Sequence, residues 1–151
     1  MMSVPSATRV LIVDDDATIR ELLGSVLRRR DLIVDEATDG AEALVLLREN
    51  SYSVVLLDLL MPNVDGFGVI ENLGSAISSP VVLVITGADR ALLRKLDPRR
   101  IHGVVNKPFD TEELAALVVA CAEIKSRSPF EAMAISAMIA GGPFLAWLKL
   151  P

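Results

Sequence analysis

The feature that most constrains the fold is a regular alternation of short apolar runs with amphipathic stretches. Five runs rich in Val, Ile and Leu are predicted to be β-strands: Arg9–Val13, Leu32–Ala37, Tyr52–Asp58, Pro80–Thr86 and Gly103–Lys107. Stretches with apolar residues at helical spacing follow each run and predict helices over residues 17–29, 40–50, 66–76, 89–96 and 111–125. Strands that alternate with helices build right-handed β-α-β units, so the chain is expected to form an α/β fold with a parallel sheet and helices on both faces.

Several helix boundaries carry their own signals. Asp39 and Asp110 each stand three residues before a glutamate, which is the spacing of a capping box. Asp16 is expected to cap the first helix rather than to take part in chemistry. The Asp97-Pro98 pair is expected to end the fourth helix, because the residue before a proline disfavours helical geometry.

Composition narrows the class of protein. The chain has 151 residues, of which 52% are hydrophobic, so one domain with a sizeable core is expected and a disordered chain is excluded. The net charge of −5 argues against a free-standing nucleic-acid binder, which usually presents a basic face. A single cysteine, Cys121, excludes a disulfide within the chain, fits a reducing cytoplasm and is expected to be a small core residue. The first residues show no signal-peptide pattern, so a cytoplasmic location is expected.

Polar groups follow four of the five predicted strands. In a parallel sheet of this kind, the working site lies at the carboxyl ends of the strands. The residues at those ends should therefore converge, and they supply three carboxylates, a hydroxyl beside a glycine, and an ammonium: Asp14, Asp15, Asp58, Thr86, Gly87 and Lys107.

This set of groups suits phosphoryl chemistry around a metal ion. Carboxylate oxygens are ligands for a hard cation such as Mg²⁺, with Mn²⁺ as the alternative ion. A carboxylate held beside the ion can attack phosphorus and form an acyl phosphate. Thr86 could donate to a phosphoryl oxygen, Lys107 could pair with another, and Gly87 would let the group approach the backbone.

Four stretches of the sequence resemble the receiver domain of two-component response regulators. They are "LIVDDDATIREL", "VVLLDLLMPNVDGF", "VVLVITG" and "NKPFDTEEL", in the order of the family and near its spacing. The most specific is the second, in which Asp58 is followed four residues later by a proline and then by Asp-Gly. The resemblance extends from about Arg9 to Lys125.

The resemblance implies a fold and a set of roles. The fold is a flavodoxin-like doubly wound sheet of five parallel strands, order 2-1-3-4-5, with five helices. Asp58 would be the phosphoacceptor, which takes the phosphoryl group from a histidine kinase or a histidine phosphotransfer protein. Asp15 would bind Mg²⁺ directly, Asp14 mostly through water, and the Leu60 backbone carbonyl would be a further ligand.

The same resemblance assigns the remaining site residues. Thr86 and Lys107 would contact the phosphoryl oxygens, and a cis peptide before Pro108 would aim the lysine. The chain would be a signalling protein that phosphorylates and dephosphorylates itself with magnesium, not an enzyme acting on external substrates. A magnesium phosphatase of the haloacid dehalogenase type would need an aspartate two residues after Asp58, where Leu60 stands.

The sequence also departs from the family. Many receivers carry an aromatic residue three positions before the lysine, and Val104 stands there. The segment before it is slightly short, so the fourth helix is expected to be short or distorted, and His102 is expected to have a surface or turn role. These departures leave a second hypothesis open: the chain could be a receiver-like interaction or dimerisation module that works without phosphorylation. A flavin-binding protein is disfavoured, since no phosphate-binding loop is present.

The domain plan has three parts. Residues 1–8 are expected to be an N-terminal extension, residues 9–125 the receiver domain, and residues 126–151 an apolar helical tail with no recognisable output domain. The tail is expected to pack against a second protomer or partner, with packing on its own receiver domain as the alternative. A membrane location is disfavoured, because Glu131 and the Gly-Gly-Pro that follows interrupt a short apolar window.

Overall fold

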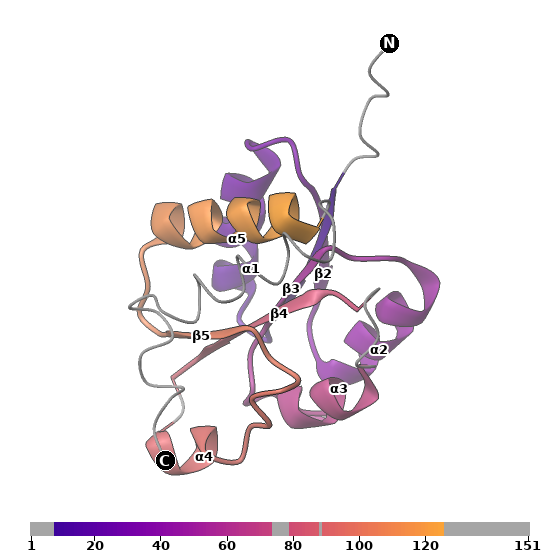
Figure 1. Ribbon diagram of the computed structural model, residues 1–151, viewed down its shortest axis with the longest axis vertical. Helices are drawn as coiled ribbons and strands as arrows, with labels where there is room; N and C mark the ends of the chain where they lie inside the picture. Colours follow the sequence, from indigo (N-terminus) through magenta and orange to yellow (C-terminus); the bar gives the residue numbers. More distant parts are fainter. Residues whose placement is uncertain (1–7, 74–78, 88, 126–151) are drawn as a thin grey trace.

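A five-stranded parallel sheet forms the centre of the computed structural model, which describes residues 8–73, 79–87 and 89–125 (Figure 1). The strand order is β2-β1-β3-β4-β5, which confirms the flavodoxin-like order expected from the sequence. The strands are β1 Arg9–Val13, β2 Ile33–Ala37, β3 Val54–Leu57, β4 Val81–Thr86 and β5 Gly103–Asn106. The predicted strands were thus correctly placed, and β1 has the predicted bounds.

Strand β3 is shorter than predicted by two residues at its start and one at its end. The hydrogen-bond ladder nevertheless continues past these bounds, since the Ser53 amide donates to the Arg9 carbonyl at 2.9 Å. Beyond the other end, the Asp58 amide donates to the Val13 carbonyl at 2.9 Å. Asp58 is therefore tied to the end of β1 by its backbone although it lies outside the strand.

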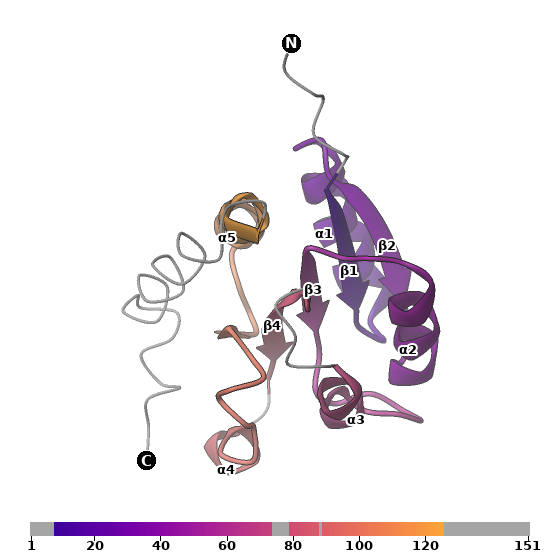
Figure 2. The same cartoon turned by 45° about the vertical axis from the view of Figure 1, so that its right-hand side comes forward.

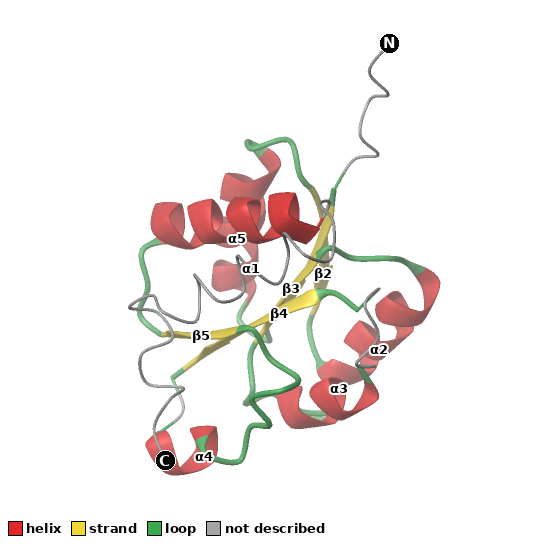
Figure 3. Cartoon of the chain, in the orientation of Figure 1, coloured by secondary structure: helices red, strands yellow, loops and turns green. Residues whose placement is uncertain are grey.

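Five helices are described, and they cover both faces of the sheet (Figures 2 and 3). Their bounds are α1 Ala17–Arg28, α2 Gly40–Glu49, α3 Gly66–Asn72, α4 Arg90–Leu93 and α5 Thr111–Lys125. Helices α1 and α5 pack on one face, while α2, α3 and α4 pack on the other.

The alternation of side chains along the strands divides the core into two layers. Val10 and Ile12 of β1 face the layer under α1 and α5, whereas Leu11 and Val13 face the layer under α2, α3 and α4. Cys121 is buried in the first layer, as predicted. Strands buried on both faces explain why the runs in the sequence are continuously apolar.

Two helices end earlier than predicted. Helix α3 ends at Asn72 rather than at residue 76, because Leu73 adopts extended geometry with φ −79° and ψ 123°. Helix α4 has four residues and ends at Leu93, not at Asp97. Its continuation is tightened by bonds between residues three apart, including the Leu96 amide to the Leu93 carbonyl at 3.1 Å. The expectation of a short fourth helix is confirmed.

The predicted helix caps are present. The carboxylates of Asp16, Asp39 and Asp110 each accept from an amide in the first turn of α1, α2 and α5, at 2.9, 2.8 and 2.9 Å. The capping box at α2 differs in one respect. The Glu42 carboxylate accepts from the amide of Thr38 rather than from that of Asp39.

The apolar tail predicted over residues 126–151 and most of the N-terminal extension lie outside the described residues. Among the helices that are described, none has the length and apolar character needed to cross a membrane.

Candidate functional site

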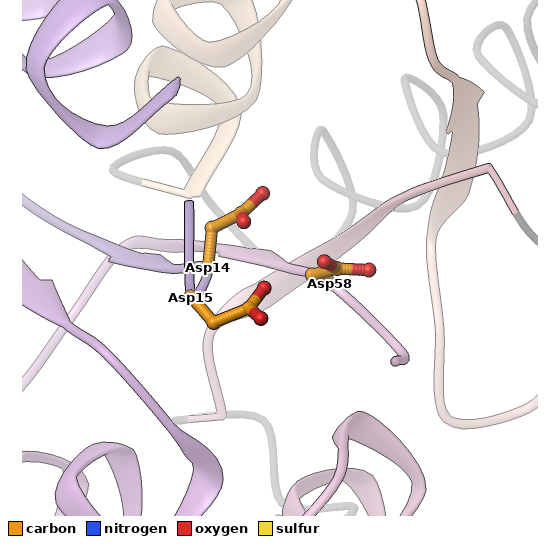
Figure 4. Close-up of side chains that lie close together, drawn as sticks. All are labelled: Asp14, Asp15 and Asp58. Carbon is orange, nitrogen blue, oxygen red and sulfur yellow. The ribbon is translucent and has the colours of Figure 1, made fainter. Parts of the chain in front are cut away.

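The carboxyl ends of β1 and β3 bring three carboxylates together. Asp14 and Asp15 follow β1 directly, and Asp58 follows β3. Each contributes a carboxylate oxygen to a group whose members lie within 4.8 Å of one another. The three side chains lie close together in Figure 4. Asp14 and Asp58 are buried, with 3% and 6% of their surface exposed, whereas Asp15 is exposed.

Lys107 lies between two of these carboxylates. Its ammonium nitrogen is 2.8 Å from Asp14 Oδ2 and 3.2 Å from Asp58 Oδ2. The lysine follows β5, and its amide donates to the Thr86 carbonyl at the end of β4 at 3.1 Å. The Lys107-Pro108 peptide is cis, as predicted. Four strand ends thus meet at one edge of the sheet.

The charges at this edge do not balance. Burial raises the pKa of Asp58, the ammonium of Lys107 opposes that rise, and the neighbouring Asp14 adds to it, so that the pKa lies above its usual value. Burial would lower the pKa of Lys107, but its bonds to Asp14 and Asp58 outweigh this effect and keep the amine charged. One ammonium among three carboxylates leaves excess negative charge, which a divalent cation would offset.

The three carboxylates differ in how far they are already occupied. Asp14 accepts from the Asp16 amide at 2.9 Å through one oxygen and from Lys107 through the other. Asp58 accepts from the Leu60 amide at 3.3 Å and from Lys107. The Asp15 carboxylate has no hydrogen-bond partner in the part of the chain that the structure describes. An all-oxygen donor set with one carboxylate still open fits a hard divalent ion.

The other predicted site residues are at the same edge. Thr86 is fully buried at the end of β4. A Cβ atom at Gly87 would meet no atom within 4 Å, so the space beside this backbone is open. Leu60 lies in the loop after β3 with 55% of its surface exposed.

Two of the departures from the family have structural explanations. Val104 is fully buried in the layer under α4, together with Leu93, Leu96 and Ile101. His102 lies at the surface, as predicted, directly before β5, where its amide donates to the Val82 carbonyl at 2.8 Å and its Nδ1 accepts from the Val82 amide at 3.0 Å. It therefore extends the pairing of β4 with β5.

The loop after Asp58 depends on Asn63, which sequence reasoning did not single out, and on Gly66, which it quoted only as part of the Asp-Gly motif. Asn63 has a positive φ of 65°, and its side-chain amide donates to Asp39 at the start of α2 at 3.0 Å. A Cβ atom at Gly66 would lie 2.4 Å from the Asp58 carbonyl oxygen, so only glycine fits there. The Pro-Asn and Asp-Gly pairs in "MPNVDG" are turn signals that could have pointed to both residues.

Arg20 was also missed. Its guanidinium reaches back from α1 and donates to the Asp14 carbonyl oxygen at 2.7 Å. An arginine on a helix usually suggests a solvated face, so periodicity alone gave no reason to place it at the site.

Comparison with known proteins gives a consistent result. The family model described as the response regulator receiver domain matches residues 10–119. The transcriptional regulatory protein ResD of Bacillus subtilis (strain 168) is 30% identical over 129 residues, which cover 85% of this chain and 54% of that protein. The probable transcriptional regulator ycf27 of Guillardia theta is 34% identical over 129 residues, which cover 81% of this chain and 48% of that protein. This chain thus spans about half the length of these relatives.

Solved structures show the same fold. A signal receiver domain from Bermanella marisrubri matches with a TM-score of 0.68 and 30% identity, covering 77% of this chain and 98% of that chain. A CheY-like receiver domain protein from Methanospirillum hungatei JF-1 matches with a TM-score of 0.71 and 20% identity, covering 80% of this chain and 97% of that chain. At that identity, the second match is evidence for the fold alone.

Proposed function

This chain belongs to the family of response regulator receiver domains, and from that premise we propose that it accepts a phosphoryl group on Asp58 in a magnesium-dependent reaction. The donor is a phosphohistidine on a histidine kinase or on a histidine phosphotransfer protein. The phosphorylated domain then signals through altered contacts with other proteins.

The observation that carries the proposal is the setting of Asp58. Its carboxylate is buried, lies beside a second buried carboxylate, and contacts the ammonium of Lys107 at 3.2 Å. Asp58 has hydrogen-bond partners, as a structural aspartate would, but its pKa is raised, because burial and the neighbouring Asp14 outweigh the effect of Lys107. Such a carboxylate, next to an open all-oxygen donor set, suits a nucleophile that works beside a cation.

The transfer step balances without a further reactant. A carboxylate oxygen of Asp58 attacks phosphorus, a new O–P bond forms, and the P–N bond to the donor imidazole breaks. The imidazole leaves with the bonding pair and takes up a proton from solvent. In this proposal Lys107 would pair with a phosphoryl oxygen, and Thr86 would donate a hydrogen bond to another.

The residues present fit the proposed metal. Asp15 would bind Mg²⁺ directly, since its carboxylate is exposed and open, while Asp14 would act mostly through water, as the resemblance to receiver domains implies. Asp58 and the Leu60 backbone carbonyl would complete the protein ligands, and Mn²⁺ could replace Mg²⁺. A bound divalent ion would neutralise charge that develops on the phosphoryl oxygens.

The proposal extends to the setting in the cell. We place the reaction in the cytoplasm, with self-phosphorylation and self-dephosphorylation as the only chemistry and with no external substrate. The named relatives are transcriptional regulators, so control of transcription is a candidate output, reached through protein contacts and not through binding of nucleic acid by residues 9–125. A homodimer formed through residues 126–151 remains part of the proposal.

Intact-mass analysis after incubation with acetyl phosphate tests the proposal, with and without Mg²⁺. Wild type is expected to gain one phosphoryl group only with Mg²⁺, and Asp58→Asn is expected to gain none. Asp35→Asn is the matched control, because it changes a partly buried aspartate of β2 that pairs with Arg9 and not with the acidic site, so this variant should be phosphorylated like wild type. An Asp58→Asn protein that is still phosphorylated, or a wild type that never is, would favour a module that signals by binding alone.

A further inference from the structure

We infer that Arg20 is a positioning residue for the acidic site, an inference that rests on the proposed function. Its guanidinium holds the turn that carries Asp14 and Asp15, so that both carboxylates face Asp58 before any cation binds. It acts through the backbone and touches none of the reacting groups.

Arg20 closes this turn at two points. Its backbone amide donates to the Asp16 carbonyl oxygen at 3.1 Å in the first turn of α1. Its Nη1 donates to the Asp14 carbonyl oxygen at 2.7 Å, the shorter of the two bonds. One residue thus bonds to the backbone on both sides of Asp15, through its amide and through its guanidinium, and 15% of its side chain is exposed.

The turn has other supports, including the bond from Lys107 to the Asp14 carboxylate and the bonds from the first-turn amides of α1 to the Asp16 carboxylate, but none of them involves the Asp15 side chain. The Asp14 amide donates to the Ala37 carbonyl at 3.2 Å, and the Asp14 carboxylate accepts from the Asp16 amide. The Asp15 side chain forms no hydrogen bond with another described residue that would hold Asp15 in place. The position of the Asp15 carboxylate therefore depends on the backbone on either side of it, which the bond from Arg20 to the Asp14 carbonyl fixes.

Arg20 is itself held in place by a neighbouring strand. Glu36 of β2 lies 3.6 Å from Arg20 Nε through one oxygen and 3.1 Å from Arg28 Nη2 through the other. Gly24 lies between the two arginines on α1, where a Cβ atom would come within 2.8 Å of the Arg28 guanidinium. A glycine inside a helix is less favourable than an alanine, and here it leaves room for this charged network.

Arg28 provides a matched control within the same network. It shares Glu36 with Arg20, and it also donates to a backbone carbonyl, that of Val34, at 3.1 Å. Its contacts are all on β2, away from Asp14. Arg28→Met therefore removes a similar set of interactions from the same helix without touching the turn that carries Asp14 and Asp15.

Arg20 could influence cation binding by positioning the ligands or only by its positive charge, and the two roles change the cation affinity in opposite directions when Arg20 is removed. If Arg20 acted only as a nearby positive charge, its removal would strengthen binding of a cation at the acidic site. If Arg20 orients the ligands, its removal must weaken binding, and outer residues that orient metal ligands typically contribute about 10- to 100-fold in affinity. The two roles thus predict opposite changes for the same variant.

The experiment measures Mn²⁺ affinity from the electron paramagnetic resonance signal of the free ion, for wild type, Arg20→Met, Arg20→Lys and Arg28→Met. Amide hydrogen exchange of Asp14 and Asp16, the two hydrogen-bonded amides of the turn, is measured in parallel without metal. We expect Arg20→Met to weaken Mn²⁺ binding by about 10-fold and to speed exchange at both amides. Arg20→Lys, which keeps one donor within reach of the carbonyl, should recover part of both losses, and Arg28→Met should match wild type.

Three results would overturn the inference: unchanged or tighter Mn²⁺ binding in Arg20→Met, unchanged amide exchange in that variant, or equal losses in Arg28→Met. Failure of the proposed function would look different. In that case wild type itself would bind no Mn²⁺ at a site sensitive to Asp15→Asn, while the amide exchange would still report whether Arg20 holds the turn.

Discussion

Two aspartates, Asp35 and Asp58, each have a cation beside them, yet their pKa values are shifted in opposite directions. Asp35, in the middle of β2, bonds to residues at the amino ends of β1 and β3: it accepts from the Tyr52 hydroxyl at 2.7 Å and from Arg9 at 2.9 Å. Burial acts to raise the pKa of Asp35, but the bonds from Tyr52 and Arg9 outweigh it and hold the pKa below its usual value. Asp58, at the carboxyl end, also has a cation beside it, yet its pKa is raised.

The difference lies in what surrounds each carboxylate. Asp35 has a hydroxyl donor and a guanidinium, whereas Asp58 is more deeply buried and shares one ammonium with Asp14. The partners of Asp35 therefore stabilise its negative charge. Around Asp58, excess negative charge remains, which favours the binding of a cation and of a phosphoryl group that the cation neutralises.

The largest effect is expected where the backbone of the carboxyl end is packed most closely. Gly66→Ala would place a Cβ atom 2.4 Å from the Asp58 carbonyl and 2.7 Å from the Leu59 Cα atom, neither of which can move without shifting the site. We expect a loss of about 3 kcal/mol in the free energy of unfolding, together with loss of phosphorylation, measured by urea denaturation and intact mass.

Gly68→Ala is the control for that variant. Two residues further along α3, a Cβ atom would meet only a methyl group of Val64 within 3 Å, and alanine favours the helix. Its stability should stay within about 1 kcal/mol of wild type. Equal losses in the two variants would show that close packing is not special to the turn after Asp58.

A smaller effect is expected at Asp35. Asp35→Asn keeps an acceptor for Tyr52 but removes the charge that Arg9 pairs with, and this should lower the free energy of unfolding at neutral pH by about 1 kcal/mol. The pKa of Asp35 is lowered in the folded protein, so its contribution is full above the unfolded value of 3.8 and is lost as the pH falls through the folded value. Urea denaturation over that range should therefore show wild type and variant converging in acid. A variant more stable than wild type would remove the contrast with Asp58.

The smallest effect concerns His102, which also lies toward the amino ends of the strands. Its packing, with the charge of Lys125 as a lesser cause, lowers its pKa below 6.5. A neutral Nδ1 is needed to accept from the Val82 amide. The unfolded chain binds the proton more readily, so wild type should lose stability as the pH falls below 6.5 toward the folded value.

His102→Asn keeps an acceptor and removes the titration. The difference between the two proteins should change by about 0.5 kcal/mol or less between pH 5 and pH 8, because the ring is partly in water. Thermal unfolding at several pH values measures it. If the stability of the two proteins changes identically with pH, protonation of His102 does not affect stability.

Most of the fold could be predicted from the sequence, because burial on both faces leaves continuous apolar runs and capping aspartates mark helix starts. The strand order came from the resemblance to receiver domains and is confirmed, as is the family. The ends of α3 and α4 could not be predicted, since the extended geometry of Leu73 and the tightened turn before Leu96 depend on tertiary packing.

The site was predictable where a functional group follows a strand. Asp14, Asp15, Asp58 and Lys107 converge as the carboxyl-end rule requires. The contact of Arg20 with this site was not predictable, because its guanidinium donates to the backbone carbonyl of Asp14. A side-chain bond to a backbone carbonyl produces no periodic pattern in the sequence.

The most direct test of the contrast between the two aspartates is thermal unfolding of wild type and Asp58→Asn, in chelator and in Mg²⁺. We predict that Asp58→Asn is the more stable protein in chelator, by on the order of 1 kcal/mol, because it relieves the repulsion from Asp14 and the cost of burying a charge. Saturating Mg²⁺ should raise the Tm of wild type and reduce or reverse the difference. A wild type that is more stable than Asp58→Asn in chelator and does not respond to Mg²⁺ would contradict the account, since Asp58 would then be a satisfied structural carboxylate like Asp35.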